Sequence, residues 1–350
     1  MPAPSRRTVL KSIGLIGLGT LAATRRGLSL ARAQSDSIPA LPPRWNGQPL
    51  GRITGKTMNV RAEPSTDSEV VAVLERDDVV RVRRAVHGEA TFPNNDLWLE
   101  TPRGYLYASF VQPMWYHLPN PPRADLGNGR WAELTVPYSN AYWDPEPNED
   151  RFVSRQHYGS VYRIEELVTG GDGKSWYRVR ELYQSYYMRA THLRIIPPEE
   201  LTPISPEVDP HEKRIEVNLA TQTLIAYEGE RPVFAHLISS GIPDYATPEG
   251  EHRVVDKRIS TRMIGGAASD EEEYYNLPGV PFVCYFTWEW AATHGTYWHN
   301  DYGRPRSHGC LNLPPDAARW IWRWTTPYAD YDSLYFRPRT RSEGTRIIIY

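Results

Sequence analysis

The chain has 350 residues, with 40 basic and 42 acidic side chains and a formal charge of −2 at pH 7. This balance makes nucleic acid and anionic membrane surfaces poor partners, and the length allows two or three domains with cores of their own. Twelve tryptophans and 22 tyrosines supply amphipathic surface, which is common in peptide or carbohydrate clefts and equally common in small β cores.

The amino-terminal segment has the features of an export signal. Ser5-Arg6-Arg7 precedes an apolar stretch at residues 12–23, and Ala31-Arg32-Ala33 follows as an A-x-A-like cleavage site. This pattern resembles a twin-arginine signal, so we expect residues 1–33 to be a signal peptide and the protein to reach the periplasm or cell wall. Its removal would take away six basic residues and shift the formal charge to −8.

The apolar stretch of this signal is too short to span about 30 Å of hydrocarbon, so we expect no stable membrane insertion. A retained membrane anchor is the alternative interpretation.

After a Pro-rich linker at residues 34–50, short apolar runs alternate with turn residues such as Glu63-Pro64-Ser65, as in a small β domain. Asn59–Pro64, followed by Val70–Leu74, resembles a bacterial SH3-like domain, which we place at residues 51–114. The runs expected to form its strands are Met58–Arg61, Val70–Leu74, Val79–Val86, Leu97–Glu100 and Tyr105–Tyr107.

A second copy of this domain is expected at residues 131–198. Pro64 has a counterpart in Pro145 and Trp98 in Trp176, at offsets near 80 residues. Residues 115–130 and 199–211 would be linkers. Since residues 51–200 contain no cysteine and no close nucleophile–base pair, we expect them to bind or orient rather than catalyse.

The carboxyl-terminal region, residues 212–350, alternates apolar and polar residues as strands do. One short helix is expected after Pro315, with Ala317, Ile321 and Trp324 on one face, and Arg346–Tyr350 reads as a last strand. The fold class expected for the whole chain is therefore mainly β.

Within this region, Ser307–Asn312 (Ser-His-Gly-Cys-Leu-Asn) places a thiol beside a glycine, and His294 precedes it closely. A thiol becomes a strong nucleophile as thiolate, and a neighbouring imidazole supplies the proton acceptor. Gly309 can adopt a positive φ, so the N–H groups of Gly309 and Cys310 can converge on an oxyanion. The residues predict a Cys310 nucleophile with a neighbouring imidazole as its proton acceptor.

These motifs resemble the L,D-transpeptidases with a YkuD-type catalytic domain. His294 and Ser307–Asn312 match the family signature, although the loop between them is slightly short, and Ile238–Gly241 and Thr247–Gly250 resemble its upstream strand and turn. The resemblance implies that His294 is the proton acceptor and that acyl transfer runs through a Cys310 thioester on peptidoglycan stem peptides, without a cofactor. It also implies a role in cell-wall organisation and cell shape. An amine acceptor gives a cross-link, and a water acceptor gives an L,D-carboxypeptidase.

Several residues near the nucleophile have open roles. His308 is expected either to assist the thiolate or to shape the loop, and His299-Asn300-Asp301 to belong to a flap over the cleft. A zinc site of His294, His299, His308 and Cys310 fits no structural zinc spacing, so no metal is expected. The residues expected to contact substrate are Ser307, Asn312, Tyr285 and Trp298.

The second cysteine, Cys284, lies in an apolar run and is expected in the core rather than in a disulfide. A papain-like endopeptidase is disfavoured because its cysteine precedes its histidine by a long interval. A non-catalytic wall-binding protein is disfavoured by the intact motif.

Overall fold

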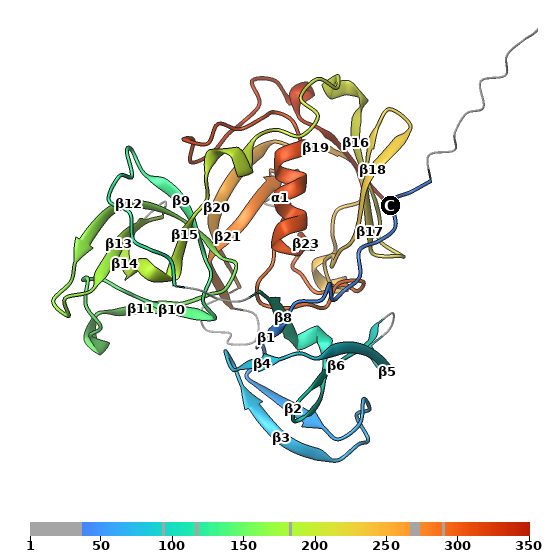
Figure 1. The fold of residues 1–350 in the computed structure, drawn as a ribbon. Coiled ribbons are helices and arrows are strands. Elements are labelled where there is room, and N and C mark those ends of the chain that lie inside the picture. Colours follow the sequence, from blue (N-terminus) through green and yellow to red (C-terminus); the bar gives the residue numbers. More distant parts are fainter. Residues whose placement is uncertain (1–36, 93–94, 116–118, 182–183, 267–273, 289–290) are drawn as a thin grey trace, which may run out of the picture. The chain divides into compact units, whose positions relative to one another are not determined.

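The computed structural model describes residues 37–92, 95–115, 119–181, 184–266, 274–288 and 291–350, and the expected export signal lies outside them. The described chain is mainly β, as the alternating pattern predicts, and its one α-helix is α1 (Pro315–Trp324) (Figure 1). None of the helices in this part of the chain has the length and apolar character needed to span a bilayer.

Residues 50–114 form two sheets around a shared core that includes Ile53, Trp98 and Leu106. Trp45, in the segment expected as a linker, is also buried in this core. One sheet has the order β4-β1-β8, with β1 (Leu50–Ile53), β4 (Val79–Arg81) and β8 (Val111–Met114). The other has the order β3-β2-β7-β6-β5, with β2 (Thr57–Arg61), β3 (Val70–Glu75), β5 (Arg84–Phe92), β6 (Asn95–Thr101) and β7 (Gly104–Tyr107).

The strand expected at Val79–Val86 is divided between these two sheets. The Val82 N–H donates to the Pro49 carbonyl, while the next N–H, that of Arg83, donates to the Glu100 carbonyl. Each sheet therefore takes one half of the apolar run, which alternation alone does not predict.

Residues 130–195 form one seven-stranded sheet with the order β11-β10-β14-β13-β12-β9-β15. Its core includes Ala141, Ile164 and Val179, all fully buried. Its strands are β9 (Arg130–Leu134), β10 (Tyr138–Tyr142), β11 (Phe152–His157), β12 (Val161–Thr169), β13 (Ser175–Arg180), β14 (Ser185–Arg189) and β15 (Leu193–Ile195).

The two amino-terminal regions share a local packing motif. A Cβ added at Gly88 would lie 2.3 Å from the Pro64 carbonyl oxygen and 2.7 Å from the Trp98 ring. A Cβ added at Gly170 would lie 1.8 Å from the Pro145 carbonyl oxygen and 2.5 Å from the Trp176 ring. In both regions a glycine thus lets a proline carbonyl and a tryptophan ring approach the backbone closely, and these prolines and tryptophans are the ones that the sequence comparison paired.

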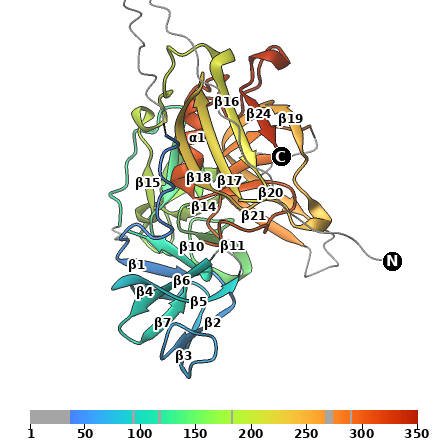
Figure 2. The same ribbon diagram turned by 90° about the vertical axis from the view of Figure 1, so that its right-hand side faces the viewer.

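The carboxyl-terminal region packs two sheets and α1 around one core (Figure 2). The first sheet has the order β18-β17-β16-β24-β19, with β16 (Lys213–Asn218), β17 (Thr223–Glu228), β18 (Arg231–Leu237), β19 (Gly250–Arg253) and β24 (Arg346–Ile349). The second has the order β20-β21-β22-β23, with β20 (Asp256–Gly265), β21 (Tyr275–Tyr285), β22 (Ala292–Gly295) and β23 (Leu311–Leu313).

The helix lies where the sequence predicts it. Pro315 opens α1 at its first turn, where a missing N–H costs nothing, and Ala317, Ile321 and Trp324 are buried against the core. Since α1 packs on β21 and β22 and directly follows β23, it supports the strands that carry the site. Short 3-10 helices complete the described chain: η1 (Ala108–Phe110), η2 (Glu149–Arg151), η3 (Ala190–His192), η4 (Pro198–Leu201), η5 (Pro210–Glu212), η6 (Pro243–Tyr245) and η7 (Arg341–Glu343).

Candidate active site

The candidate nucleophile and base lie on two neighbouring parallel strands. In the pairing of β22 with β23, Thr293 lies beside Leu311 and His294 beside Asn312. One step back along this register, Cys310 lies beside Ala292, and its thiol contacts the Ala292 backbone. Alternate residues of a strand share a face, so His294 and Cys310 lie on the same side of the sheet and line one cavity.

The loop before Cys310 is held in a tight turn. Gly309 has a φ of 102°, which favours glycine, and the Ser307 hydroxyl donates to the Cys310 carbonyl at 2.6 Å. A Cβ on Gly241 would lie 2.0 Å from the Tyr245 carbonyl oxygen and 2.9 Å from the Gly309 nitrogen. The Ile238–Gly241 motif therefore permits a close approach of two backbones at the nucleophile.

The His294 ring has a defined orientation. Its Nδ1 lies 3.1 Å from the Gly295 carbonyl oxygen, which can only accept, so Nδ1 carries the proton and Nε2 is left as the basic nitrogen. The Trp298 ring lies 5.7 Å from it, centroid to centroid. This tautomer is the one that a general base requires.

Burial keeps both members of the pair neutral. It raises the pKa of the Cys310 thiol to about 11 and lowers the pKa of the His294 imidazole to about 4. At pH 7 the resting site therefore holds a thiol and a neutral imidazole rather than a thiolate and an imidazolium. Neither Cys310 nor Cys284 is in a disulfide, and Cys284 is fully buried in the core, as expected.

The other predicted site residues are distributed around this pair. His308 is exposed and lies between Tyr245 and Tyr275, at ring distances of 4.4 and 5.1 Å. Asn312 is buried with its side-chain amide 2.9 Å from His299 Nε2, and Ser307 is buried in the nucleophile loop.

Two cavities meet at Cys310. The histidine-side cavity, about 460 Å³, is lined by His294, Trp298, Ser307 and Asn312. The wide cavity, about 940 Å³, is lined by Tyr285 and other aromatic side chains but not by His294. His308 and Cys310 line both cavities.

The expectation of a flap at His299-Asn300-Asp301 is wrong. All three residues are buried, and Asp301 is completely so. The Ser109 hydroxyl donates to the Asp301 carboxylate at 2.7 Å, and the Asn300 N–H donates to the Ser109 carbonyl, which fixes this segment against η1. Within the described ranges, no three His, Cys, Asp or Glu side chains are arranged to hold a metal ion.

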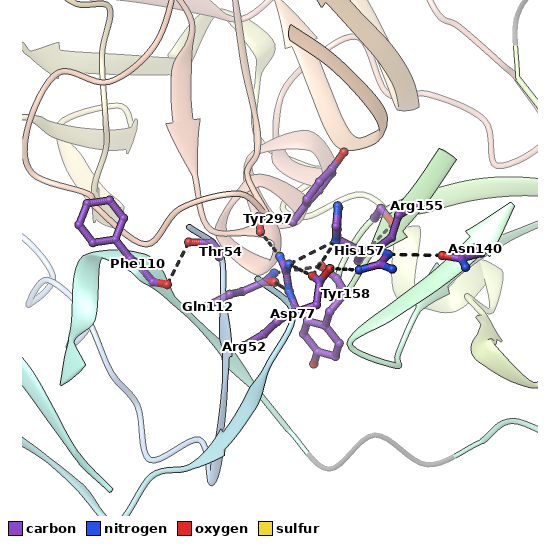
Figure 3. Close-up of polar contacts among 11 residues, drawn as sticks. Arg52, Thr54, Asp77, Phe110, Gln112, Asn140, Arg155, His157, Tyr158 and Tyr297 are labelled. Carbon is purple, nitrogen blue, oxygen red and sulfur yellow. Dashed lines mark hydrogen bonds and ion pairs between the residues drawn. The ribbon is translucent and has the colours of Figure 1, made fainter. Parts of the chain in front are cut away.

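Sequence reasoning missed a buried polar cluster at the histidine-side cavity (Figure 3). Arg52 on β1 donates to Asp77 Oδ1 at 2.7 Å and to the Tyr297 carbonyl oxygen at 2.6 Å. Arg155 and His157, on β11, lie 3.0 Å from the same Asp77 carboxylate. These residues are separated by up to 245 positions, and Asp77 lies in a segment that reads as an ordinary turn, so no spacing pattern connects them.

The contacts within the cluster also affect the ionisation of Asp77 and His157. Burial alone would raise the pKa of Asp77, but His157, Arg52 and Arg155 hold it below its usual range. Burial lowers the pKa of His157, so its ring is neutral and its Nδ1–H donates to Asp77. Both amino-terminal regions thus contribute to the wall of the site.

Comparison with known proteins identifies a family for the carboxyl-terminal region. Residues 212–349 match the family model described as the L,D-transpeptidase catalytic domain, YkuD. No curated protein matches the sequence.

Similar solved structures include an L,D-transpeptidase from Mycobacterium smegmatis, 26% identical over 40% of this chain and 58% of the other, with a TM-score of 0.32. A cysteine-to-serine variant of the Enterococcus faecium L,D-transpeptidase is 22% identical over 40% of this chain and 50% of the other (TM-score 0.31). L,D-transpeptidase 3 from Mycobacterium tuberculosis is 15% identical over 47% of this chain and 74% of the other, with a TM-score of 0.31. The chain thus spans little more than half the length of the first two. Over residues 212–349, this chain carries an L,D-transpeptidase catalytic domain of the YkuD family.

Proposed function

We propose that this protein is a peptidoglycan L,D-transpeptidase that works through a Cys310 thioester. The thiol sulfur attacks the carbonyl of the third residue of a stem peptide, the C–N bond to the terminal D-alanine breaks, and an amine of a second stem then takes the acyl group. The observation that carries the proposal is the catalytic-domain match, inside which His294 and Cys310 line one cavity.

The neutral resting pair defines how the first step proceeds. His294 Nε2 accepts the thiol proton as the sulfur attacks, and it returns that proton to the nitrogen of the departing D-alanine. The N–H groups of Gly309 and Cys310 would stabilise the oxyanion, which the positive φ of Gly309 supports. The Nδ1 contact with the Gly295 carbonyl stabilises the imidazolium that exists between the two transfers.

The other parts of the chain fit an exported wall enzyme. We propose that residues 1–33 direct export and that residues 51–114 and 131–198 are SH3-like domains that hold the enzyme on the wall and complete its cleft. The shared glycine–tryptophan packing of these two regions supports their relation to one another.

Intact-protein mass spectrometry after incubation with tetrapeptide stems tests the reaction. The wild-type protein should gain the mass of the stem minus D-alanine, and Cys310→Ala should gain nothing. Cys284→Ser is the matched control and should still be acylated, since Cys284 is fully buried. An adduct that persists in Cys310→Ala would overturn the mechanism. Release of a cross-linked dimer supports an amine acceptor, and release of free tripeptide alone supports the carboxypeptidase.

A further inference from the structure

The histidine-side cavity has an unusual charge composition. Among the described residues, its lining includes four arginines and three histidines and no aspartate or glutamate. The arginines are Arg52, Arg76, Arg155 and Arg306. They come from β1, the turn after β3, β11 and the nucleophile loop, so segments far apart in the sequence bring positive charge to one space.

The buried acids nearby do not balance this charge. Asp77 is shared by Arg52 and Arg155, at 2.7 and 3.0 Å, while His157 beside it is neutral (Figure 3). One carboxylate therefore serves two guanidinium groups, and one positive charge remains.

The same imbalance recurs in the nucleophile loop. Asp301 lies 2.6 Å from Arg304 and 3.6 Å from Arg306, so again one carboxylate serves two arginines. Arg76 is exposed and makes no ion pair within the described part of the chain. A partly open cavity with excess cations and few counterions attracts anions, because neighbouring protein replaces part of the water that would screen the charge.

We propose that this cavity binds a carboxylate group on the amino acid whose amine leaves or enters at Cys310, with Arg76, Arg155 and Arg306 as the cationic contacts. Arg52 is a positioning residue, because its donors are directed to Asp77, Gln112 and the Tyr297 carbonyl. The inference rests on the proposed function and adds a specificity to it: a free amino-acid carboxylate, bound in part by Arg76 and Arg155, which lie outside the matched catalytic domain.

The chemistry of the step explains why the carboxylate belongs on this side. The nitrogen that leaves must take a proton from His294, so it must lie in the cavity that His294 lines. The carboxylate of a terminal amino acid is only two bonds from that nitrogen, so it enters the same cavity. The wide cavity does not share the charge excess, since Glu181 lines it and pairs with Arg262 at 2.6 Å.

Two alkylating reagents of nearly equal size test the cavity without requiring turnover. Iodoacetate is an anion and iodoacetamide is neutral. Each forms a bond from its CH₂ carbon to the Cys310 sulfur, so that a carboxymethyl or carbamoylmethyl group is attached and iodide and the thiol proton are lost. In the wild-type protein, the ratio of the iodoacetate to the iodoacetamide rate should exceed that of a small uncharged thiol. Arg155→Gln and Arg76→Gln, both at exposed positions, should each lower this ratio about threefold.

Arg103→Gln is the matched control, because Arg103 is exposed and lies outside the cavity lining. Its ratio should stay at the wild-type value, which separates local binding from net charge. A ratio that is unchanged in both Arg76→Gln and Arg155→Gln would overturn the proposal, as would an equal fall in Arg103→Gln. Because alkylation needs no stem peptide, a fall confined to the two cavity variants supports the anion site even where acylation by stems fails.

Discussion

The two cavities that meet at Cys310 differ in size, charge and origin. The wide cavity has about twice the volume, mixes Glu181 with arginines, and exposes aromatic surface such as Trp288, which is 62% exposed. The histidine-side cavity is smaller, contains His294 and concentrates arginines from three parts of the chain. One thiol is therefore open to two environments, and His294 is among the described lining residues of only one of them.

This difference indicates a division of roles. A large cavity whose lining arginines are paired with acids suits a long, varied peptide, whereas a small cationic cavity beside the base suits a compact group of defined charge. Under the proposed function, the amino-terminal regions would act on catalysis through the wall of the histidine-side cavity, in addition to the proposed retention on the cell wall.

Removing Arg52 gives the largest expected change. Arg52→Met removes one of the positive charges that pair with the buried Asp77 carboxylate, and it leaves the Tyr297 carbonyl without this hydrogen-bond donor. We therefore expect the unfolding free energy, measured by denaturant titration, to fall by about 3–5 kcal/mol. Arg81→Gln, exposed on β4, is the control and should change stability by about 0.5 kcal/mol or less. A loss of unfolding free energy for Arg52→Met as small as that of the control would mean that the contacts of Arg52 with Asp77 and Tyr297 do not stabilise the fold.

Removing the base should affect the chemistry and spare the fold. His294→Ala should slow acylation of Cys310 by about 10²-fold or more, followed by the rate of mass gain with a tetrapeptide stem. The reason is that His294, whose Nε2 is left as the basic nitrogen, is the proposed acceptor of the thiol proton. Acylation of His294→Ala at the wild-type rate would show that the proton leaves through the wide cavity instead.

The pH dependence of Cys310 alkylation gives the smallest change for a single step, about tenfold for each pH unit. A thiol whose pKa is raised to about 11 is almost entirely protonated at pH 7, so the thiolate fraction rises with pH until about 11. The rate with iodoacetamide should therefore climb from pH 6 to 10 without a plateau. A plateau beginning near pH 5 would instead show a thiolate–imidazolium pair, stabilised against the burial of both groups.

The fold was predictable where local chemistry decides it. The strands at Met58–Arg61 and Arg346–Ile349 and the helix after Pro315 follow from alternation, apolar spacing and a proline start. The division of the segment at Val79–Val86 could not be predicted, because its two halves form hydrogen bonds with partners on different sheets. Likewise, His299-Asn300-Asp301 reads as a polar surface loop, and only its contacts with η1 and Asn312 explain its burial.

By itself, the sequence determined the identity of the candidate pair. His294 and Cys310 are recognisable because their neighbours in the chain, a glycine and a serine in a short turn, are part of the same chemistry. Tertiary structure alone decided the protonation states and the charge of the surroundings. Both depend on burial and on partners such as Arg52, Asp77 and Arg155, which are distant along the chain and meet only when the sheets pack.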